Sequence, residues 1–154
     1  MVEIMAVQGS GVAGGVIVSD GPYEGWEHVP HEPFNDTAGP FYHRRTADGS
    51  LLFGFTPLEK ASNKMGIVHG GCLLTFADYC LFLAARERAD PHEIVTVSMA
   101  SEFVGMAIPG EAVEGRTEII RGGRSLIFVR GLINGPNGPL LNFSGVAKVM
   151  SGRQ

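Results

Sequence analysis

This 154-residue chain contains only two cysteines. It has no basic segment at its amino terminus and no long hydrophobic run. The two cysteines, Cys72 and Cys80, share one apolar segment, which excludes a disulfide framework and fits reduced thiols. The first residues contain Glu3 but no early Lys or Arg, unlike a secretory signal or a transit peptide. The longest mostly apolar stretch, residues 72–85, is shorter than the roughly 20 residues that span a bilayer. We therefore expect a cytoplasmic protein with no membrane partner.

Positive charge is also in short supply and is unevenly distributed. Residues 1–104 contain 6 Lys or Arg against 13 Asp or Glu, whereas residues 105–154 contain 6 against 3. Nucleic-acid binding depends on clustered basic side chains that neutralise phosphates, and a chain of net charge -4 does not fit it. We expect no nucleic-acid partner, while the basic carboxyl-terminal third leaves room for a small anionic ligand.

Three familiar site motifs are absent or lack the context that they require. Residues 9–14 fit the G-x-G-x-x-G fingerprint of dinucleotide-binding proteins, but glycine and proline follow where that motif needs a helix. The possible zinc ligands are His69, Cys72, Asp78 and Cys80. They include no C-x-x-C pair and point around different sides of one expected helix. The G-x-S-x-G nucleophile elbow of serine hydrolases is missing. We expect no metal and no cofactor.

The amino-terminal part of the chain differs in composition from the rest. Residues 1–40 are rich in glycine, contain four prolines and show no helical spacing of apolar residues. We predict a partly ordered arm there, with at most one strand near residues 16–18, followed by a single domain over residues 41–154. Within this domain, residues 51–56 form a predicted strand, and residues 70–88 form a predicted helix that is apolar almost all round and therefore buried.

Four further segments have the alternating or β-rich pattern of strands, and glycine or proline turns separate them. They are residues 95–103, 111–121, 125–133 and 140–150. The connections are too short for crossover helices, so the last strands are expected to form an antiparallel meander. One long apolar helix against a twisted antiparallel sheet is an α+β fold.

Asp78 is the most unusual residue of the predicted helix. Its neighbours one turn away are Leu74, Thr75, Leu81 and Phe82, so the helix offers the carboxylate no cation. Burying an unpaired carboxylate costs several kcal/mol, and proteins tolerate that cost mostly where chemistry requires it. A second interpretation is that Asp78 faces only a wet groove or a partner subunit.

The helix is preceded by a segment that suits a developing negative charge. Gly70 and Gly71 open it, and free backbone N–H groups at a helix start can form an oxyanion hole. A plainer interpretation is that the two glycines only allow a tight turn into the helix. In the same way, His69 alone is more typical of a structural histidine than of a catalyst.

The combination of Asn63, His69-Gly70-Gly71 and Asp78 on a hydrophobic helix between strands resembles the PaaI-like acyl-CoA thioesterases of the hotdog superfamily. The resemblance covers about residues 50 to 150. It implies a hotdog fold, with an antiparallel sheet wrapped around one long central helix. It also implies a homodimer, often paired into a homotetramer, with active sites at the subunit boundary.

The resemblance also implies roles for individual residues. Asp78 is similar to the general base or nucleophile of thioester hydrolysis. Gly70 would lend its backbone N–H to the thioester oxygen, and Asn63 would orient the attacking water or the carbonyl. His69 would support the loop, and the hydroxyl of Thr96 would hold a water.

A second segment is similar to the family's strand and turn that line the nucleotide of coenzyme A. Its residues are Arg121, Gly122, Gly123, Arg124, Ser125 and Leu126. Two arginines beside glycines provide charge-assisted donors for phosphates. Ser98, which we expect on the same strand face as Thr96, would touch the pantetheine arm. The alternative interpretation of the segment is a surface hairpin with solvated arginines.

Taken together, these features predict an acyl-CoA thioesterase, which releases a free acid and coenzyme A without a metal or cofactor. The alternative, from a different class, is a hotdog protein that binds acyl-CoA or another hydrophobic ligand without hydrolysing it. An unpaired carboxylate favours catalysis, because a binding module has no need of one.

Overall fold

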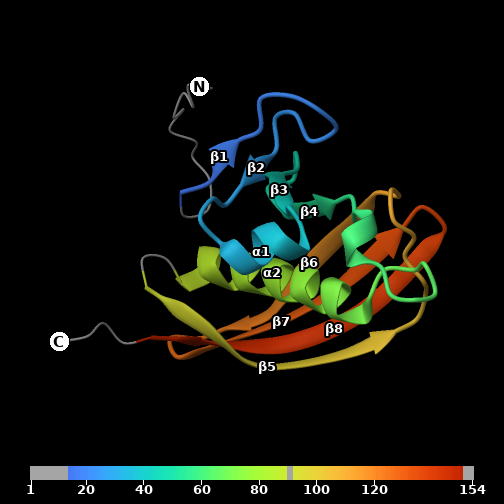
Figure 1. Cartoon of the computed structure of the whole chain (residues 1–154). Coiled ribbons are helices and arrows are strands. Elements are labelled where there is room, and N and C mark those ends of the chain that lie inside the picture. The colour runs from blue at the N-terminus through green and yellow to red at the C-terminus, as the bar shows by residue number, and fades with distance from the viewer. Residues whose placement is uncertain (1–13, 90–91, 151–154) are drawn as a thin grey trace.

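One curved antiparallel sheet encloses one long helix, α2, in the computed structural model, which describes residues 14–89 and 92–150 (Figure 1). The strand order is β1-β2-β3-β4-β6-β7-β8-β5. The elements, in chain order, are β1 (Val16–Ile17), β2 (Glu27–His28), α1 (Pro33–Ala38), β3 (Tyr42–Arg45), β4 (Leu51–Phe55), the 3-10 helix η1 (Glu59–Ala61), α2 (Gly70–Ala89), β5 (Ile94–Phe103), β6 (Val113–Gly122), β7 (Leu126–Gly135) and β8 (Gly138–Val149). The predicted α+β hotdog fold is confirmed.

Helix α2 is the centre of the hydrophobic core, as its all-round apolar sequence predicts. The large, fully buried side chains of the core include residues of the helix and of the strands that wrap it: Phe53, Phe55, Phe76, Leu81, Ile127, Val129 and Phe143. Burial of apolar area stabilises by about 25 cal/mol per Å², so helix and sheet depend on each other for stability. No helix in the described ranges is both long and apolar enough to span a membrane.

The strand pairing confirms most of the predicted meander and corrects one part of it. Strands β6, β7 and β8 pair in sequence order, with short turns between them. Strand β5 does not lie next to β6, because β4 occupies that edge through the pairing of Phe55 with Val113. Instead β5 pairs with β8 at the other end of the sheet, where Phe103 lies opposite Leu141. Residues 104–112 connect β5, at the end of the sheet, to β6, which lies inside it between β4 and β7.

The described part of the amino-terminal arm has more structure than the sequence predicts. The expected strand near residues 16–18 is present as β1, but β2 and α1 were not expected. Helix α1 begins with Pro33, a residue suited to the first helical turn, and packs on α2 (Figure 1). Elements of two to six residues are too short to show a period in the sequence. The expectation of at most one strand is therefore wrong, while the domain boundary after residue 40 stays a prediction.

Two glycines allow the helix to lie close to the sheet. A Cβ atom on Gly115 would lie 2.8 Å from the Cys80 Sγ atom. A Cβ atom on Gly145 would overlap Leu81 and lie 2.7 Å from the Ser98 carbonyl oxygen of the neighbouring strand. The contact with the Ser98 carbonyl oxygen involves backbone, which cannot change its rotamer as a side chain can.

We predict that Gly145→Ala destabilises the protein by about 1–3 kcal/mol, because the added methyl group overpacks the contact between helix and sheet. Urea unfolding of the variant measures the change. Ser144→Ala, on the exposed face of the same strand, is the control and is expected to stay within about 0.5 kcal/mol of the parent. Equal midpoints for Gly145→Ala and Ser144→Ala would contradict this packing.

Candidate active site

The first turn of α2 presents a free backbone amide. The N–H of His69 donates to the Ala61 carbonyl (2.8 Å), and the N–H of Cys72 donates to the His69 carbonyl (2.9 Å). For the N–H of Gly70, the described residues supply no acceptor. A Cβ on Gly70 would lie 3.1 Å from the ring of Phe103, so the residue is small where space is limited. This N–H lies at the positive end of the helix dipole, which favours negative charge.

The side chain of His69 holds the helix start in place. Its Nδ1 atom accepts a hydrogen bond from the Gly71 N–H (2.9 Å). Because Nδ1 is an acceptor, the proton of the neutral ring lies on Nε2. The geometry fits the supporting role that the resemblance implies for this histidine.

Asn63 lies in the loop that leads to α2, and one of its side-chain atoms already has a hydrogen-bond partner. Its Oδ1 atom accepts a hydrogen bond from the Met65 N–H (2.8 Å), and Gly66 continues the turn with a positive φ of 75°. The loop is tied to the next connection by a bond from the Val68 N–H to the Ala107 carbonyl (2.9 Å). The oxygen of Asn63 therefore serves the loop, which leaves its NH₂ group as the donor for a ligand.

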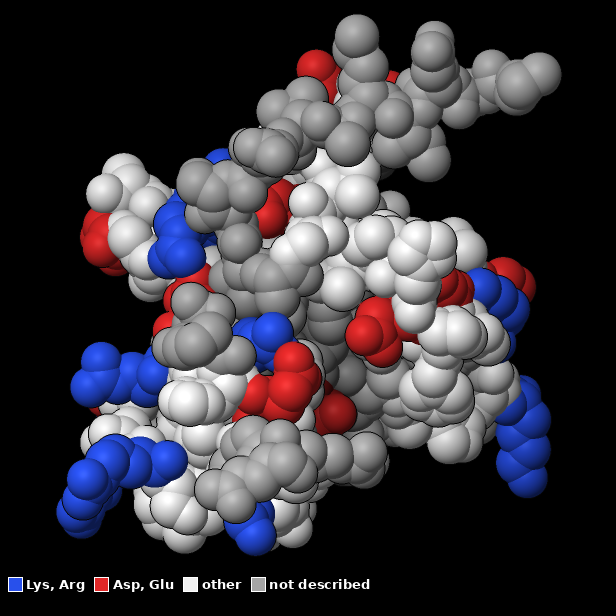
Figure 2. Space-filling view, turned by 90° about the vertical axis from the view of Figure 1, so that its left-hand side faces the viewer, with Lys and Arg blue, Asp and Glu red and all other residues white. Residues whose placement is uncertain are grey.

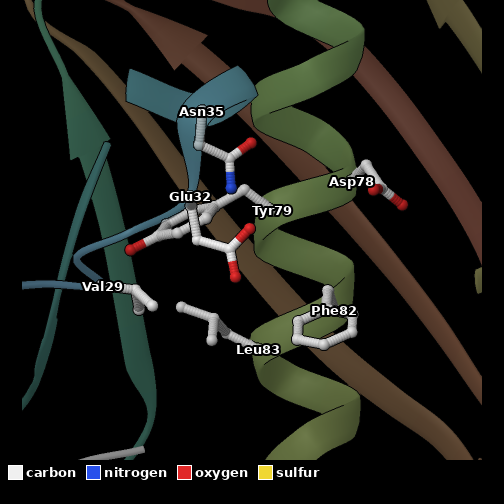
Figure 3. A pocket seen from close by; sticks show the side chains of 7 residues that line it. All are labelled: Val29, Glu32, Asn35, Asp78, Tyr79, Phe82 and Leu83. Atoms are coloured by element: carbon white, nitrogen blue, oxygen red, sulfur yellow. The ribbon is translucent and has the colours of Figure 1, made fainter. Parts of the chain in front are cut away.

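Asp78 is half-buried near the middle of α2. No hydrogen bond or ion pair of its carboxylate is found among the residues that the structure describes. It borders a cavity of about 240 Å³ between α2 and the segment around α1. In Figure 3 its carboxylate points away from Glu32 and Asn35 on the far side of this cavity. The carboxylate is thus unpaired and open to a ligand, as the local sequence predicts.

One chain does not bring Gly70 and Asp78 together. Eight residues separate them on a regular helix, which is about 12 Å along the helix axis at 1.5 Å per residue. An oxyanion donor must lie about 3 Å from the carbonyl oxygen, and a base that acts through the attacking water must lie about 3 Å from that water, so a separation of about 12 Å is too large for one site. A site that uses both residues therefore needs more than one chain.

A bulge in β5 places Thr96 and Ser98 on opposite faces of the sheet, which corrects the expectation that they share one. Thr96 pairs with Ala147, which is fully buried beneath α2, and the Thr96 hydroxyl is buried without a partner among the described residues. The ladder then skips Val97, and Ser98 pairs with Val146 on the outer face. An extra residue in a strand shifts its alternation by one, and the sequence gives no sign of it here.

On the outer face, the structure brings together two of the predicted coenzyme A residues. Ser98, Val146, Phe128 and Arg121 form one cross-strand row over β5, β8, β7 and β6. The row lines a groove of about 500 Å³. Ser98 and Arg121 therefore border the same groove three strand spacings apart, roughly 14 Å, and they lie on the face away from Thr96.

The turn between β6 and β7 contains the rest of the predicted coenzyme A segment. The N–H of Gly123 donates to the carbonyl of Leu126 (2.9 Å), and the Val149 N–H donates to the carbonyl of Ser125 (2.8 Å). Arg124 is exposed at the tip. Among the described ion pairs, none includes an arginine of this turn.

This turn lies under the end of α2. A Cβ on Gly122 would lie 2.6 Å from the Arg88 Nε atom, so the side chain of Arg88, in the last turn of the helix, lies over the glycine. Figure 2 shows this end of the molecule, where basic and acidic side chains are interspersed. From Gly70 to Arg88 the helix rises about 27 Å. The predicted oxyanion donor and the arginine turn therefore lie at opposite ends of one chain.

A group of buried polar residues was missed from the sequence. His43 Nδ1 lies 2.8 Å from the Tyr79 hydroxyl, next to the cavity, and His43 Nε2 lies 3.7 Å from Glu27 Oε2. Burial lowers the pKa of His43 to about 4, with help from His28 and Arg45, and burial raises the pKa of Tyr79. His43 is therefore neutral near pH 7. Glu27 and His43 lie on the short strands β2 and β3. Strands of this length show no alternation in the sequence, so the sequence does not indicate that these residues are close to Tyr79.

An antiparallel sheet around a central helix, with a free amide and an unpaired carboxylate on that helix, defines the class of hotdog thioester hydrolases. Residues 65–139 match the model of the thioesterase superfamily. The candidate esterase PA0474 of Pseudomonas aeruginosa is 32% identical over 115 residues, which cover 74% of this chain and 86% of the relative. The chain belongs to the thioesterase superfamily, and the predicted class of thioester hydrolases is confirmed.

Solved structures share the fold at lower identity. A point mutant of the phenylacetic acid degradation protein PaaI from Thermus thermophilus has a TM-score of 0.68 at 21% identity, covering 77% of this chain and 100% of that one. The BH2602 protein from Bacillus halodurans, solved with CoA, has a TM-score of 0.66 at 19% identity, covering 72% and 74%. A hypothetical thioesterase from Streptococcus pneumoniae, solved with coenzyme A, has a TM-score of 0.65 at 17% identity, covering 74% and 91%.

We predict that stability falls as the pH is lowered from about 6.5 to about 4, because His43 takes up a proton in the unfolded chain before it does so in the folded one. The difference between the folded and unfolded pKa values of His43 corresponds to a decrease of up to about 3 kcal/mol in the free energy of unfolding. Urea unfolding at several pH values measures it. His43→Gln should flatten this dependence, and His92→Gln, at an exposed histidine, should not. If the free energy of unfolding of the wild type changes with pH no more steeply than that of His43→Gln, His43 is not the source of the pH dependence.

Proposed function

We propose that the protein is an acyl-CoA thioesterase, which hydrolyses the thioester to a free acid and coenzyme A. The observation that carries the proposal is the unpaired, half-buried carboxylate of Asp78 beside a cavity, on the helix whose first amide, at Gly70, is free. Structural relatives solved with coenzyme A support the choice of substrate. The two free, buried cysteines support a cytoplasmic location.

The reaction requires a base and an oxyanion donor, and no metal or cofactor. Asp78 accepts a proton from water, whose oxygen forms a bond to the thioester carbon. The Gly70 N–H stabilises the resulting oxyanion. The carbon–sulfur bond then breaks, and the leaving thiolate takes the proton. In the alternative route, Asp78 attacks the carbon itself, and water opens the resulting anhydride.

The remaining residues have supporting roles in this proposal. The NH₂ group of Asn63 donates to the carbonyl or to the attacking water, and His69 fixes the loop. The unpaired hydroxyl of Thr96 holds a water on the helix side of the sheet. Arg121 and Arg124, which have no ion pair in the described part of the chain, bind phosphates of coenzyme A.

The proposed site is shared between two copies of the chain in a homodimer. The separation of Gly70 and Asp78 along one helix supports this arrangement, because an antiparallel second helix can bring its own Gly70 near Asp78. Strand β5 is the last strand of the sheet, and its side chains Val95 and Val97 are exposed. Pairing of two β5 edges would cover them and align the helices. Further pairing of dimers into a tetramer is part of the same proposal.

We predict that Asp78→Asn lowers kcat by about 10²- to 10⁴-fold, because the amide cannot accept the proton from water. Thiol release from a panel of acyl-CoAs measures kcat, and calorimetry measures binding. Glu87→Gln, which removes another carboxylate from α2, is the control and should retain activity. Binding of acyl-CoA without thiol release by the wild type would identify a non-catalytic binding protein instead.

We predict that Gly70→Pro lowers kcat by about 10²- to 10³-fold, because proline lacks the N–H that stabilises the oxyanion. Proline is tolerated at the first helical position, and Gly70→Ala adds the same Cβ beside Phe103 while retaining the N–H. The alanine variant should therefore be much more active than the proline variant.

Mixing Asp78→Asn with Gly70→Pro tests whether two chains share the site. Half of randomly mixed dimers contain one chain of each kind, and each has one intact site, so about a quarter of wild-type activity should return. A mixture that is no more active than either variant alone would place the whole site in one chain. Light scattering of each sample checks that dimers are present.

A further inference from the structure

A segment ahead of the predicted domain forms one wall of the cavity beside Asp78. We call residues 29–35, which lead into and begin α1, the strap. The cavity of about 240 Å³ lies between the strap and α2, and its lining besides Asp78 consists of Val29, Glu32, Asn35, Tyr79, Phe82 and Leu83.

The cavity is lined by polar groups of the strap and by apolar side chains of α2, and Asp78 borders it. Figure 3 shows the carboxylate of Glu32 and the amide of Asn35 close to the Tyr79 ring, whereas Asp78 lies on the other side of α2. Phe82 and Leu83 lie farther along the helix (Figure 3). The same cavity therefore offers an acyl group apolar contacts along α2 and polar contacts from the strap.

The two polar side chains of the strap are free to bind a ligand. Neither the Glu32 carboxylate nor the Asn35 amide has a partner among the residues that the structure describes, whereas nearby Asp36 pairs with His28 (3.3 Å). An ionised carboxylate only accepts hydrogen bonds, and the amide adds a second acceptor oxygen.

The wall that carries these side chains is fixed to the core. The Tyr79 hydroxyl lies 2.8 Å from His43 Nδ1, which holds the floor of the cavity in place. The Cys72 thiol donates to the Ala38 carbonyl (3.5 Å) at the end of α1. A fixed wall selects ligands more sharply than a mobile one, because less ordering is needed on binding.

Building on the proposed thioesterase function, we propose that this cavity binds the acyl group and that Glu32 and Asn35 select acyl groups ending in a hydrogen-bond donor. A terminal hydroxyl or ammonium group satisfies the free acceptors. Glu32 is exposed and Asn35 half-buried, so a terminal methyl group offers these acceptors no hydrogen bond in place of water, and a terminal carboxylate meets the like charge of Glu32.

The volume adds a limit on size. Pockets for drug-sized ligands span roughly 300–1,000 Å³, and about 240 Å³ falls below this range. The proposed substrates therefore carry short acyl groups.

The test compares four CoA esters with the same five methylene groups and different ends. They are the esters of heptanoic, 6-hydroxyhexanoic, 6-aminohexanoic and heptanedioic acid. For the wild type, we expect kcat/KM for the hydroxyl and amino esters to exceed that of the heptanoyl ester by about 10-fold, and the heptanedioyl ester to be the poorest. Thiol release gives kcat and KM separately, and the preference should appear mainly in KM.

Variants of the strap identify the groups responsible. Glu32→Gln should reduce the advantage of the amino ester and retain that of the hydroxyl ester. Glu32→Leu combined with Asn35→Leu should bring the ratio of hydroxyl to heptanoyl ester close to one. Glu24→Gln, at an exposed carboxylate of the amino-terminal segment outside the cavity, should leave all ratios unchanged.

Equal kcat/KM for the four esters, or a hydroxyl preference that survives in the double variant, would overturn the role of the strap and leave the thioesterase proposal standing. Release of thiol from none of these esters, nor from shorter acyl-CoAs, would instead overturn the proposed function on which the inference rests.

Discussion

The packing of an apolar helix into the hollow of a curved sheet is the constraint on which the rest of this molecule depends. Because α2 is apolar on almost every side, it is stable only when strands surround it, and the strands in turn have no other core. Gly115 and Gly145 set how closely the two layers approach. The position of every residue on α2 follows from this one fit, including the free amide at its start and the carboxylate at its middle.

Asp78 is costly in such a setting, because each polar group in an apolar layer must find water, a partner or a ligand. The structure leaves Asp78 half-buried, so its carboxylate retains access to water. In the proposed enzyme, catalysis and stability thus make opposite demands on the same helix. The buried pair of His43 and Tyr79 differs, since His43 Nδ1 and the Tyr79 hydroxyl form a hydrogen bond and the histidine stays neutral. The other ring nitrogen, Nε2, has no hydrogen-bond partner among the described residues.

The sequence predicted what rests on long periodic patterns and missed what rests on single residues. The helix over residues 70–88, the β6–β8 meander and the unpaired state of Asp78 follow from the apolar pattern around them. The opposite orientation of Thr96 and Ser98 does not, because one extra residue at Val97 reverses the alternation without leaving a pattern. Helix α1, whose first turn ends the strap, was missed for a related reason, since a six-residue helix fixed by tertiary contacts is too short to show a period in the sequence.

The irregularity at Val97 also bears on how the chain avoids improper association. A flat, regular strand at the end of a sheet accepts almost any extended segment, which is a common start of aggregation. In β5 the bulge interrupts the row of backbone donors and acceptors near one end. A foreign strand laid along this edge loses hydrogen bonds at that point, whereas a strand with a matching interruption does not. One additional residue thereby makes this end of the sheet more selective for the strand that pairs with it.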